Sequence, residues 1–142
     1  MPTRVGAREA HALTEKEGYV QVDVRSVAEF EAGHPAGSHN IPWMHIDAHG
    51  RALNPDFVEV FERTFPDKAS KVVLTCMSGN RSMQALSALE ARGYGSLVDQ
   101  RAGWGGARDA FGRVTDEGWS QASLPAETGA GGERSYEALS KR

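Results

Sequence analysis

Cysteine is almost absent from this sequence of 142 residues, which contains a single one, Cys76. One thiol cannot form a disulfide within the chain, so a disulfide-stabilised scaffold is excluded. The chain also has no second thiol that could resolve a mixed disulfide on Cys76. Any redox or sulfur chemistry at this cysteine therefore needs a reaction partner from outside the chain.

The sequence also lacks a strong excess of one charge and any long apolar run. The formal net charge is −3, with 25% charged and 39% hydrophobic residues. This composition gives no reason to expect nucleic acid or a membrane as a partner, and no run approaches the length of a membrane span. The first residues, Met1-Pro2-Thr3-Arg4, lack the apolar core of a signal peptide. The cytoplasm is therefore the expected compartment.

Short β-branched segments alternate with helical patterns along the chain. Strands are predicted over residues 19–25, 39–42, 71–75 and 96–99, and helices over 7–16, 26–33, 54–65, 82–93 and 107–111. Ser26 and Glu29 have the spacing of a capping box, which supports the second helix. The alternation predicts an α/β fold, with a central parallel sheet flanked by helices on both faces.

The chain is expected to form one domain followed by an extension. Residues 4–112 contain the alternating strands and helices, and the chain length suits a single hydrophobic core. Residues 113–142 have weaker patterns and are predicted to be a C-terminal extension. Within it, residues 128–132 read as a flexible glycine-rich linker and residues 135–141 as a terminal helix.

Cys76 stands between a predicted strand and a predicted helix. Residues 71–75 deliver it into the loop Cys-Met-Ser-Gly-Asn-Arg-Ser, which opens directly into the helix. N–H groups at a helix N-terminus favour negative charge, and the thiolate is the nucleophilic form of cysteine. The setting predicts that Cys76 is a catalytic nucleophile. The alternative is a buried structural cysteine at the end of a strand.

Four groups of residues form motifs that occur together in one known family. They are Asp23-Val24-Arg25, the segment Gly33-His34-Pro35-Ala36-Gly37-Ser38-His39-Asn40-Ile41-Pro42, the loop from Cys76 to Ser82, and Gly103-Trp104. Over residues 4–112 the chain resembles the single-domain rhodaneses, which are sulfurtransferases. One departure is Ala102-Gly103, where the family often has paired glycines.

The resemblance implies a rhodanese-like fold and catalysis through a persulfide on Cys76. A sulfane sulfur would pass from a donor such as thiosulfate to a thiophilic acceptor, either cyanide or a thiol. A protein is a further candidate for the acceptor, and no cofactor is implied. A different hypothesis is a non-enzymatic rhodanese-like module with a regulatory or binding role. Many such modules lack the cysteine, whereas this chain has both Cys76 and Arg81.

The residues of the cysteine loop are predicted to bind the donor. Arg81 is the candidate for the donor's sulfonate group, because a planar guanidinium binds oxyanions through two parallel hydrogen bonds. The alternative is that Arg81 pairs with a nearby carboxylate and only shapes the loop. Gly79 is expected to adopt a backbone conformation that side chains disfavour. Ser82 either caps the helix or donates its hydroxyl to the sulfur, and capping is favoured.

Met77, Ser78 and Asn80 complete the predicted donor-binding loop. Met77 and Ser78 are expected at the mouth of a pocket, where they would select which donors enter. Four residues separate Cys76 from Arg81, one fewer than in the Cys-x5-Arg loop of cysteine-dependent phosphatases. The shorter loop favours a single sulfur atom over a tetrahedral phosphate. A phosphatase or arsenate reductase is therefore the less favoured enzyme.

Other charged residues near these motifs are given structural roles. Asp23 and Arg25 are expected to tie the end of a strand to neighbouring loops rather than to act in catalysis. Four histidines lie close together in sequence: His34, His39, His45 and His49. None forms an i, i+4 pair on a predicted helix with a supporting acid, and none has a Cys-x-x-Cys partner, as zinc sites tend to, so no metal site is predicted.

Overall fold

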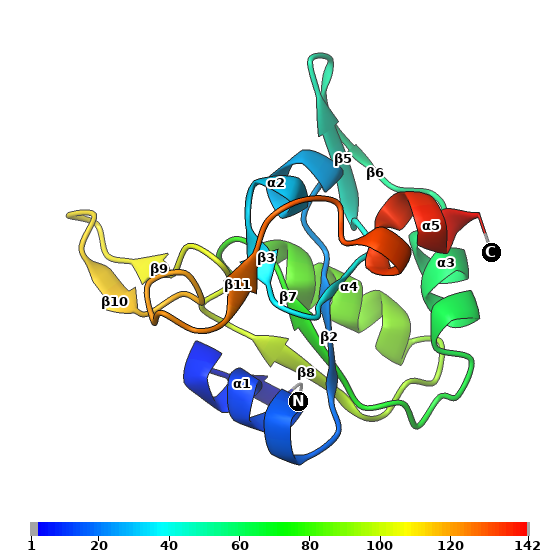
Figure 1. Cartoon of the computed structure of the whole chain (residues 1–142), viewed down its shortest axis with the longest axis horizontal. Coiled ribbons are helices and arrows are strands. Elements are labelled where there is room, and N and C mark those ends of the chain that lie inside the picture. The colour runs from blue at the N-terminus through cyan, green and yellow to red at the C-terminus, as the bar shows by residue number, and fades with distance from the viewer. Residues whose placement is uncertain (1–2, 142) are drawn as a thin grey trace.

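A parallel β-sheet lies at the centre of the computed structural model, which describes residues 3–141 (Figure 1). The strand order is β1-β8-β7-β2-β4, and every pairing between neighbours is parallel. The strands are β1 (Thr3–Val5), β2 (Val20–Asp23), β4 (His39–Asn40), β7 (Val72–Thr75) and β8 (Leu97–Gln100). The predicted central parallel sheet is confirmed. β1 was missed, and the strand expected over 19–25 is shorter than predicted.

Helices cover both faces of this sheet. They are α1 (Ala7–Lys16), α2 (Val27–Ala32), α3 (Phe57–Thr64), α4 (Asn80–Glu90) and α5 (Tyr136–Ser140). Val72 and Leu74 of β7 share a core with residues of α3, α4 and α5, whereas Val73 shares a second core with residues of α1. Successive side chains of a strand point to opposite faces, so β7 is buried on both sides. The α/β fold class is confirmed.

Three two-stranded ribbons lie outside the main sheet. They pair β5 (Met44–Asp47) with β6 (Gly50–Leu53), β9 (Ala107–Arg108) with β10 (Val114–Asp116), and β3 (His34–Pro35) with β11 (Ala126–Glu127). In Figure 1 the β5–β6 hairpin stands out from the body beside α2, and the β9–β10 hairpin projects from another side. No helix among the described residues is long and apolar enough to cross a bilayer.

The helix predicted over residues 107–111 is wrong, because this segment begins a hairpin. The Asp109 carboxylate accepts hydrogen bonds from the backbone N–H groups of Phe111 (2.8 Å) and Arg113 (3.0 Å). Gly112 has a φ of 79°, in the left-handed region. A short acidic side chain that binds the backbone in this way competes with helical hydrogen bonding, so the chain turns back on itself.

The segment predicted as a C-terminal extension packs against the rest of the molecule. Trp119 is buried in the core that contains α1, and Leu139 of α5 is buried in the core that contains α3 and α4. The Gly129 N–H donates a hydrogen bond of 2.8 Å to the Glu31 carbonyl, and the Arg134 guanidinium donates one of 2.7 Å to the Ser38 carbonyl. The predicted terminal helix is observed as α5. The domain boundary at residue 112 and the flexibility of the linker stay predictions.

The burial of Leu139 predicts that α5 contributes to the stability of the whole domain. Leu139→Ala should lower the free energy of unfolding by about 2–5 kcal/mol, because it leaves a cavity in the main core. Urea denaturation measures this difference. Lys141→Ala is the control, because Lys141 is exposed and lies within one helical turn of Leu139. It should lower the free energy of unfolding by less than about 0.5 kcal/mol. Equal effects of the two changes would contradict the packing of α5.

Candidate active site

The sulfur of Cys76 lies at the end of β7 and accepts a backbone hydrogen bond from the loop that follows. The N–H group of Gly79 is 3.0 Å from Sγ. Gly79 has a φ of 95°, and a Cβ there would lie 2.6 Å from the carbonyl oxygen of Arg101 and 2.9 Å from Nη2 of Arg4. The predicted backbone conformation of Gly79 is confirmed, and its close neighbours also require glycine; donor binding by Gly79 stays a prediction. An N–H group aimed at the sulfur stabilises negative charge on it.

The segment after β8 donates backbone hydrogen bonds to the first two residues of the cysteine loop. The Trp104 N–H donates to the Cys76 carbonyl (2.7 Å), and the Gly105 N–H donates to the Met77 carbonyl (3.0 Å). Gly103 has a φ of 67°, and a Cβ there would lie 2.5 Å from the Cys76 carbonyl oxygen. Glycine is thus required at position 103, whereas position 102 accommodates the buried side chain of an alanine. The departure from paired glycines leaves this turn intact.

Ser82 lies behind the sulfur and does not cap the helix, so the favoured prediction is wrong. α4 begins two residues earlier than expected, with Gly79 at its N-cap and no side-chain cap. Ser82 therefore falls in the first turn and points inward. Its Oγ is 3.4 Å from the Cys76 sulfur, and its hydroxyl donates to the buried carboxylate of Asp99. Arg4 donates to the other oxygen of Asp99 at 2.8 Å, so this buried charge is paired.

Arg81 forms an ion pair with Glu29, a residue brought from α2. Two hydrogen bonds of 2.7 and 3.0 Å join the guanidinium to the two carboxylate oxygens. Ser26 and Glu29 form the predicted capping box, which fixes the position of the carboxylate. Burial alone would raise the pKa of Glu29, but the hydrogen bonds from Arg81 and from the Ser26 backbone lower it to about 2. Donor binding by Arg81 stays a prediction.

A hollow of about 210 Å³ opens onto the cysteine. Its lining comes from the cysteine loop, α2 and β6: Glu29, Arg51, Cys76, Met77, Ser78, Asn80 and Arg81. Five of the seven predicted site residues therefore line one hollow. The other two, Gly79 and Ser82, are buried against the sulfur instead. Cys76 itself is only 1% exposed, so a reactant has to enter the hollow to reach it.

Arg51 is the residue of this hollow that sequence reasoning missed. It belongs to β6 and pairs across the hairpin with Ile46 of β5. The expected strands and helices included no element over residues 44–53, so nothing indicated that this segment comes near Cys76. The contact follows from the tertiary fold and not from a local motif.

Asp23 and Arg25 have the structural role that was predicted for them. The Arg25 guanidinium binds the Asp23 carboxylate with a shortest distance of 2.7 Å, and both side chains are buried. Arg25 also donates to the Gly33 carbonyl at 2.6 Å, which ties the end of β2 to the loop after α2. His34 is buried and contacts the Phe30 carbonyl at 2.6 Å. Within the described part of the chain, no three His, Cys, Asp or Glu residues form a group that could hold a metal.

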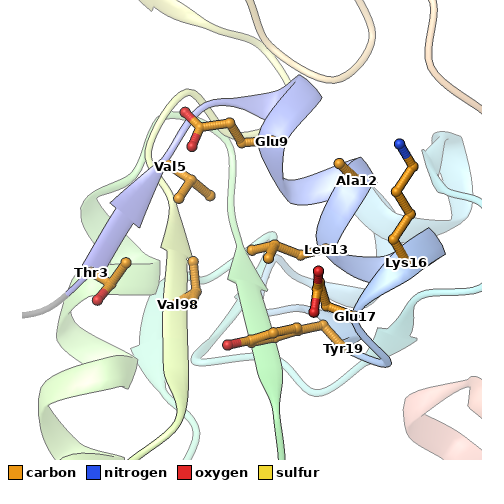
Figure 2. A pocket seen from close by; sticks show the side chains of 9 residues that line it. All are labelled: Thr3, Val5, Glu9, Ala12, Leu13, Lys16, Glu17, Tyr19 and Val98. Atoms are coloured by element: carbon orange, nitrogen blue, oxygen red, sulfur yellow. The ribbon is translucent and has the colours of Figure 1, made fainter.

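A second hollow, of about 350 Å³, lies on the other side of the sheet from the cysteine loop's helix. Figure 2 shows Val5 of β1, Leu13 of α1 and Val98 of β8 near one another, with the Tyr19 ring below them. Its lining is mainly apolar and contains no cysteine. Its chemistry differs from that of the cysteine hollow, so the cysteine hollow is the candidate active site.

Comparison with known proteins agrees with this geometry. Residues 6–107 match the family model described as Rhodanese-like domain. The chain belongs to the rhodanese-like family. This rhodanese-like chain is 34% identical over 104 residues to thiosulfate sulfurtransferase 16, chloroplastic, of Arabidopsis thaliana, covering 73% of this chain and 85% of that protein. The predicted resemblance is confirmed.

Two further similarities define the extent of the match. The rhodanese-like chain is 34% identical over 104 residues to the senescence-associated protein DIN1 of Raphanus sativus; the match covers 73% of this chain but only 56% of that protein. The crystal structure of Rv0390 from M. tuberculosis superimposes with a TM-score of 0.71 at 26% identity, covering 89% of this chain and 98% of that one. The fold and the family are therefore shown over most of the chain.

The lowered pKa of Glu29 predicts how acid affects the Glu29–Arg81 pair. Because the pKa of Glu29 is lower in the folded state, the pair contributes stability above the ordinary glutamate pKa of 4.5, and this contribution is lost as the pH falls toward about 2. Glu29→Gln should cost about 1–2 kcal/mol near neutral pH, after discounting for partial exposure, while glutamine can still complete the capping box. Urea denaturation over a pH series should show the difference from wild type shrinking as the pH falls below 4.5, the ordinary pKa of glutamate. A difference independent of pH would contradict the ion pair.

The close neighbours of Gly79 predict a larger cost of substitution there than at another left-handed glycine. Gly37 has a φ of 82° and open space around it, so Gly37→Ala should cost about 1–2 kcal/mol from backbone strain alone. Gly79→Ala should cost about 1–3 kcal/mol more because of the clash, and should slow alkylation of Cys76. Urea denaturation and iodoacetamide kinetics measure the two effects. Equal stability of the two variants would mean that the loop relaxes without loss.

Proposed function

We propose that this protein is a sulfurtransferase that carries a sulfane sulfur on Cys76 as a persulfide. The observation that carries the proposal is the Gly79 N–H at 3.0 Å from the Cys76 sulfur, at the floor of a hollow in a rhodanese-like domain. The relative from A. thaliana named thiosulfate sulfurtransferase 16 supports thiosulfate as a test donor. The physiological donor and acceptor are separate questions.

In the first half-reaction the Cys76 thiolate attacks the terminal sulfur of thiosulfate. A sulfur–sulfur bond forms on Cys76, the bond to the sulfonate sulfur breaks, and sulfite leaves with the electron pair. The product on the enzyme is a cysteine persulfide anion. The Gly79 N–H is already aimed at this region, so it can stabilise the charge without reorganisation.

In the second half-reaction a thiophilic acceptor attacks the outer sulfur of the persulfide. Cyanide would leave as thiocyanate and a thiol as its persulfide, and Cys76 returns as a thiolate. The sequence of two transfers through one covalent intermediate predicts ping-pong kinetics. A protein thiol is a further candidate for the acceptor, and the cytoplasm stays the predicted compartment.

The buried position of Cys76 favours sulfur transfer over phosphate chemistry. With Cys76 only 1% exposed, the transferred atom has to be the tip of the reactant. A terminal sulfur meets this condition, whereas a phosphoryl centre is surrounded by oxygens. Arg81 is also turned to Glu29, and so is not directed at a tetrahedral oxyanion over the sulfur.

The proposal predicts one added sulfur on Cys76 after incubation with thiosulfate. Intact mass spectrometry should show an increase of about 32 Da in the wild type, as expected for a covalent intermediate, and none in Cys76→Ser. Cyanide should remove the added mass and release thiocyanate. A protein that binds thiosulfate without gaining mass would be a binding module instead. Turnover of an aryl phosphate by the unmodified protein would show that the substrate class proposed for Cys76 is wrong.

A further inference from the structure

Almost every cationic side chain around the cysteine hollow is already paired with a carboxylate. Arg81 binds Glu29, Arg25 binds Asp23, and Arg4 binds Asp99, with shortest distances of 2.7, 2.7 and 2.8 Å. The Asp23 and Asp99 side chains are fully buried, so their partners cannot be released without exposing an unpaired charge to the interior. These three arginines hold the scaffold of the site.

Arg51 differs from them in position and in charge balance. It lies on the exposed hairpin strand β6, lines the same hollow as Cys76, and forms no ion pair with any carboxylate of residues 3–141. Figure 1 shows this hairpin standing beside α2, the helix that supplies Glu29. Since Glu29 and Arg81 neutralise each other, Arg51 supplies the uncompensated positive charge of the hollow.

We propose that Arg51 binds the anionic end of the sulfur donor and so selects small anionic sulfane donors, of which thiosulfate is one. The inference rests on the proposed function, and it assigns to the β5–β6 hairpin the role first predicted for Arg81. The terminal sulfur of the donor reaches down to Cys76 while its sulfonate stays at the mouth beside Arg51. A guanidinium suits this group because it offers parallel N–H donors to two oxygens.

The charge on Arg51 also addresses a problem in the first half-reaction. Both thiosulfate and the attacking thiolate are negative, so they repel each other as they approach. A cation at the mouth offsets this repulsion, and it continues to bind the sulfite that leaves. Arg51 is therefore a residue that determines specificity for the donor, and the residues of the cysteine loop carry out the sulfur transfer.

The local charge can be measured without sulfur transfer, by alkylating Cys76 with two probes of similar size. Iodoacetate is an anion and iodoacetamide is neutral, so the rate constant for iodoacetate divided by that for iodoacetamide reports the charge near the sulfur. Arg51→Gln should lower this ratio about three- to tenfold and leave the iodoacetamide rate within about twofold of wild type. Arg8→Gln is the matched control, since Arg8 makes only an exposed surface pair with Glu117 on α1's side of the molecule.

The donor itself is tested by the rate of persulfide formation with thiosulfate. Arg51→Gln should lower the second-order rate constant about three- to tenfold, Arg51→Lys should lie between it and wild type, and Arg8→Gln should match wild type. Raising the ionic strength from about 0.01 M to about 1 M shortens the Debye length from about 30 Å to about 3 Å. The ratio of the wild-type rate to that of Arg51→Gln should therefore fall toward one, because salt screens the attraction to Arg51 in the wild type alone.

The outcomes separate this inference from the proposed function. If the wild type forms a persulfide and Arg51→Gln does so at the same rate, the role of Arg51 is overturned while sulfur transfer stands. If the wild type forms no persulfide, the proposed function fails and the sulfonate assignment fails with it. An unchanged alkylation ratio in Arg51→Gln would show that its charge does not act at Cys76, whatever the donor.

Discussion

The geometry of the site depends on the parallel pairing of β2 with β7. In this register Asp23 lies opposite Thr75, and the Val24 N–H donates to the Thr75 carbonyl at 2.8 Å. The pairing brings the carboxyl end of β2, and α2 after it, beside the loop that begins at Cys76. A slip by one residue would turn every side chain of β2 to the opposite face. The buried apolar faces on both sides of the sheet prevent this slip, so core packing also positions the chemistry.

Buried charges near a nucleophile have to be neutralised, and this requirement shapes the whole pocket. Asp99, behind Ser82, and Asp23, at the end of β2, each bind an arginine. The carboxylate of Glu29 does the same for Arg81 at the wall of the hollow. With these three pairs neutralised, the Gly79 N–H is the backbone group that donates a hydrogen bond to the sulfur. The proposed reactivity of Cys76 therefore depends on the left-handed backbone of Gly79, which aims this N–H at the sulfur.

Local patterns predicted the parts of this site that local chemistry determines. The strand, loop and helix around Cys76, the capping box at Ser26 and the backbone conformation of Gly79 all follow from neighbouring residues. Patterns failed where distant contacts decide. Ser82 was assigned to the helix cap because the start of α4 was placed two residues late, and its true partner, Asp99, comes from another strand. The helix predicted at 107–111 failed for a local reason instead, because backbone hydrogen bonds to the Asp109 carboxylate compete with helical hydrogen bonding.

The β5–β6 hairpin was missed for a related reason, and that reason bears on how such a site can change. Every residue of β6 is exposed, so the strand has no buried face to give it a period of two in hydrophobicity. Few packing constraints act on such a strand, and a surface substitution there costs little stability. The loop of Cys76, by contrast, is bound by close contacts to Arg101 and Gly103. On the roles proposed for Arg51 and Cys76, substitutions in the hairpin would change which donors a rhodanese-like domain admits, while the cysteine loop keeps its geometry.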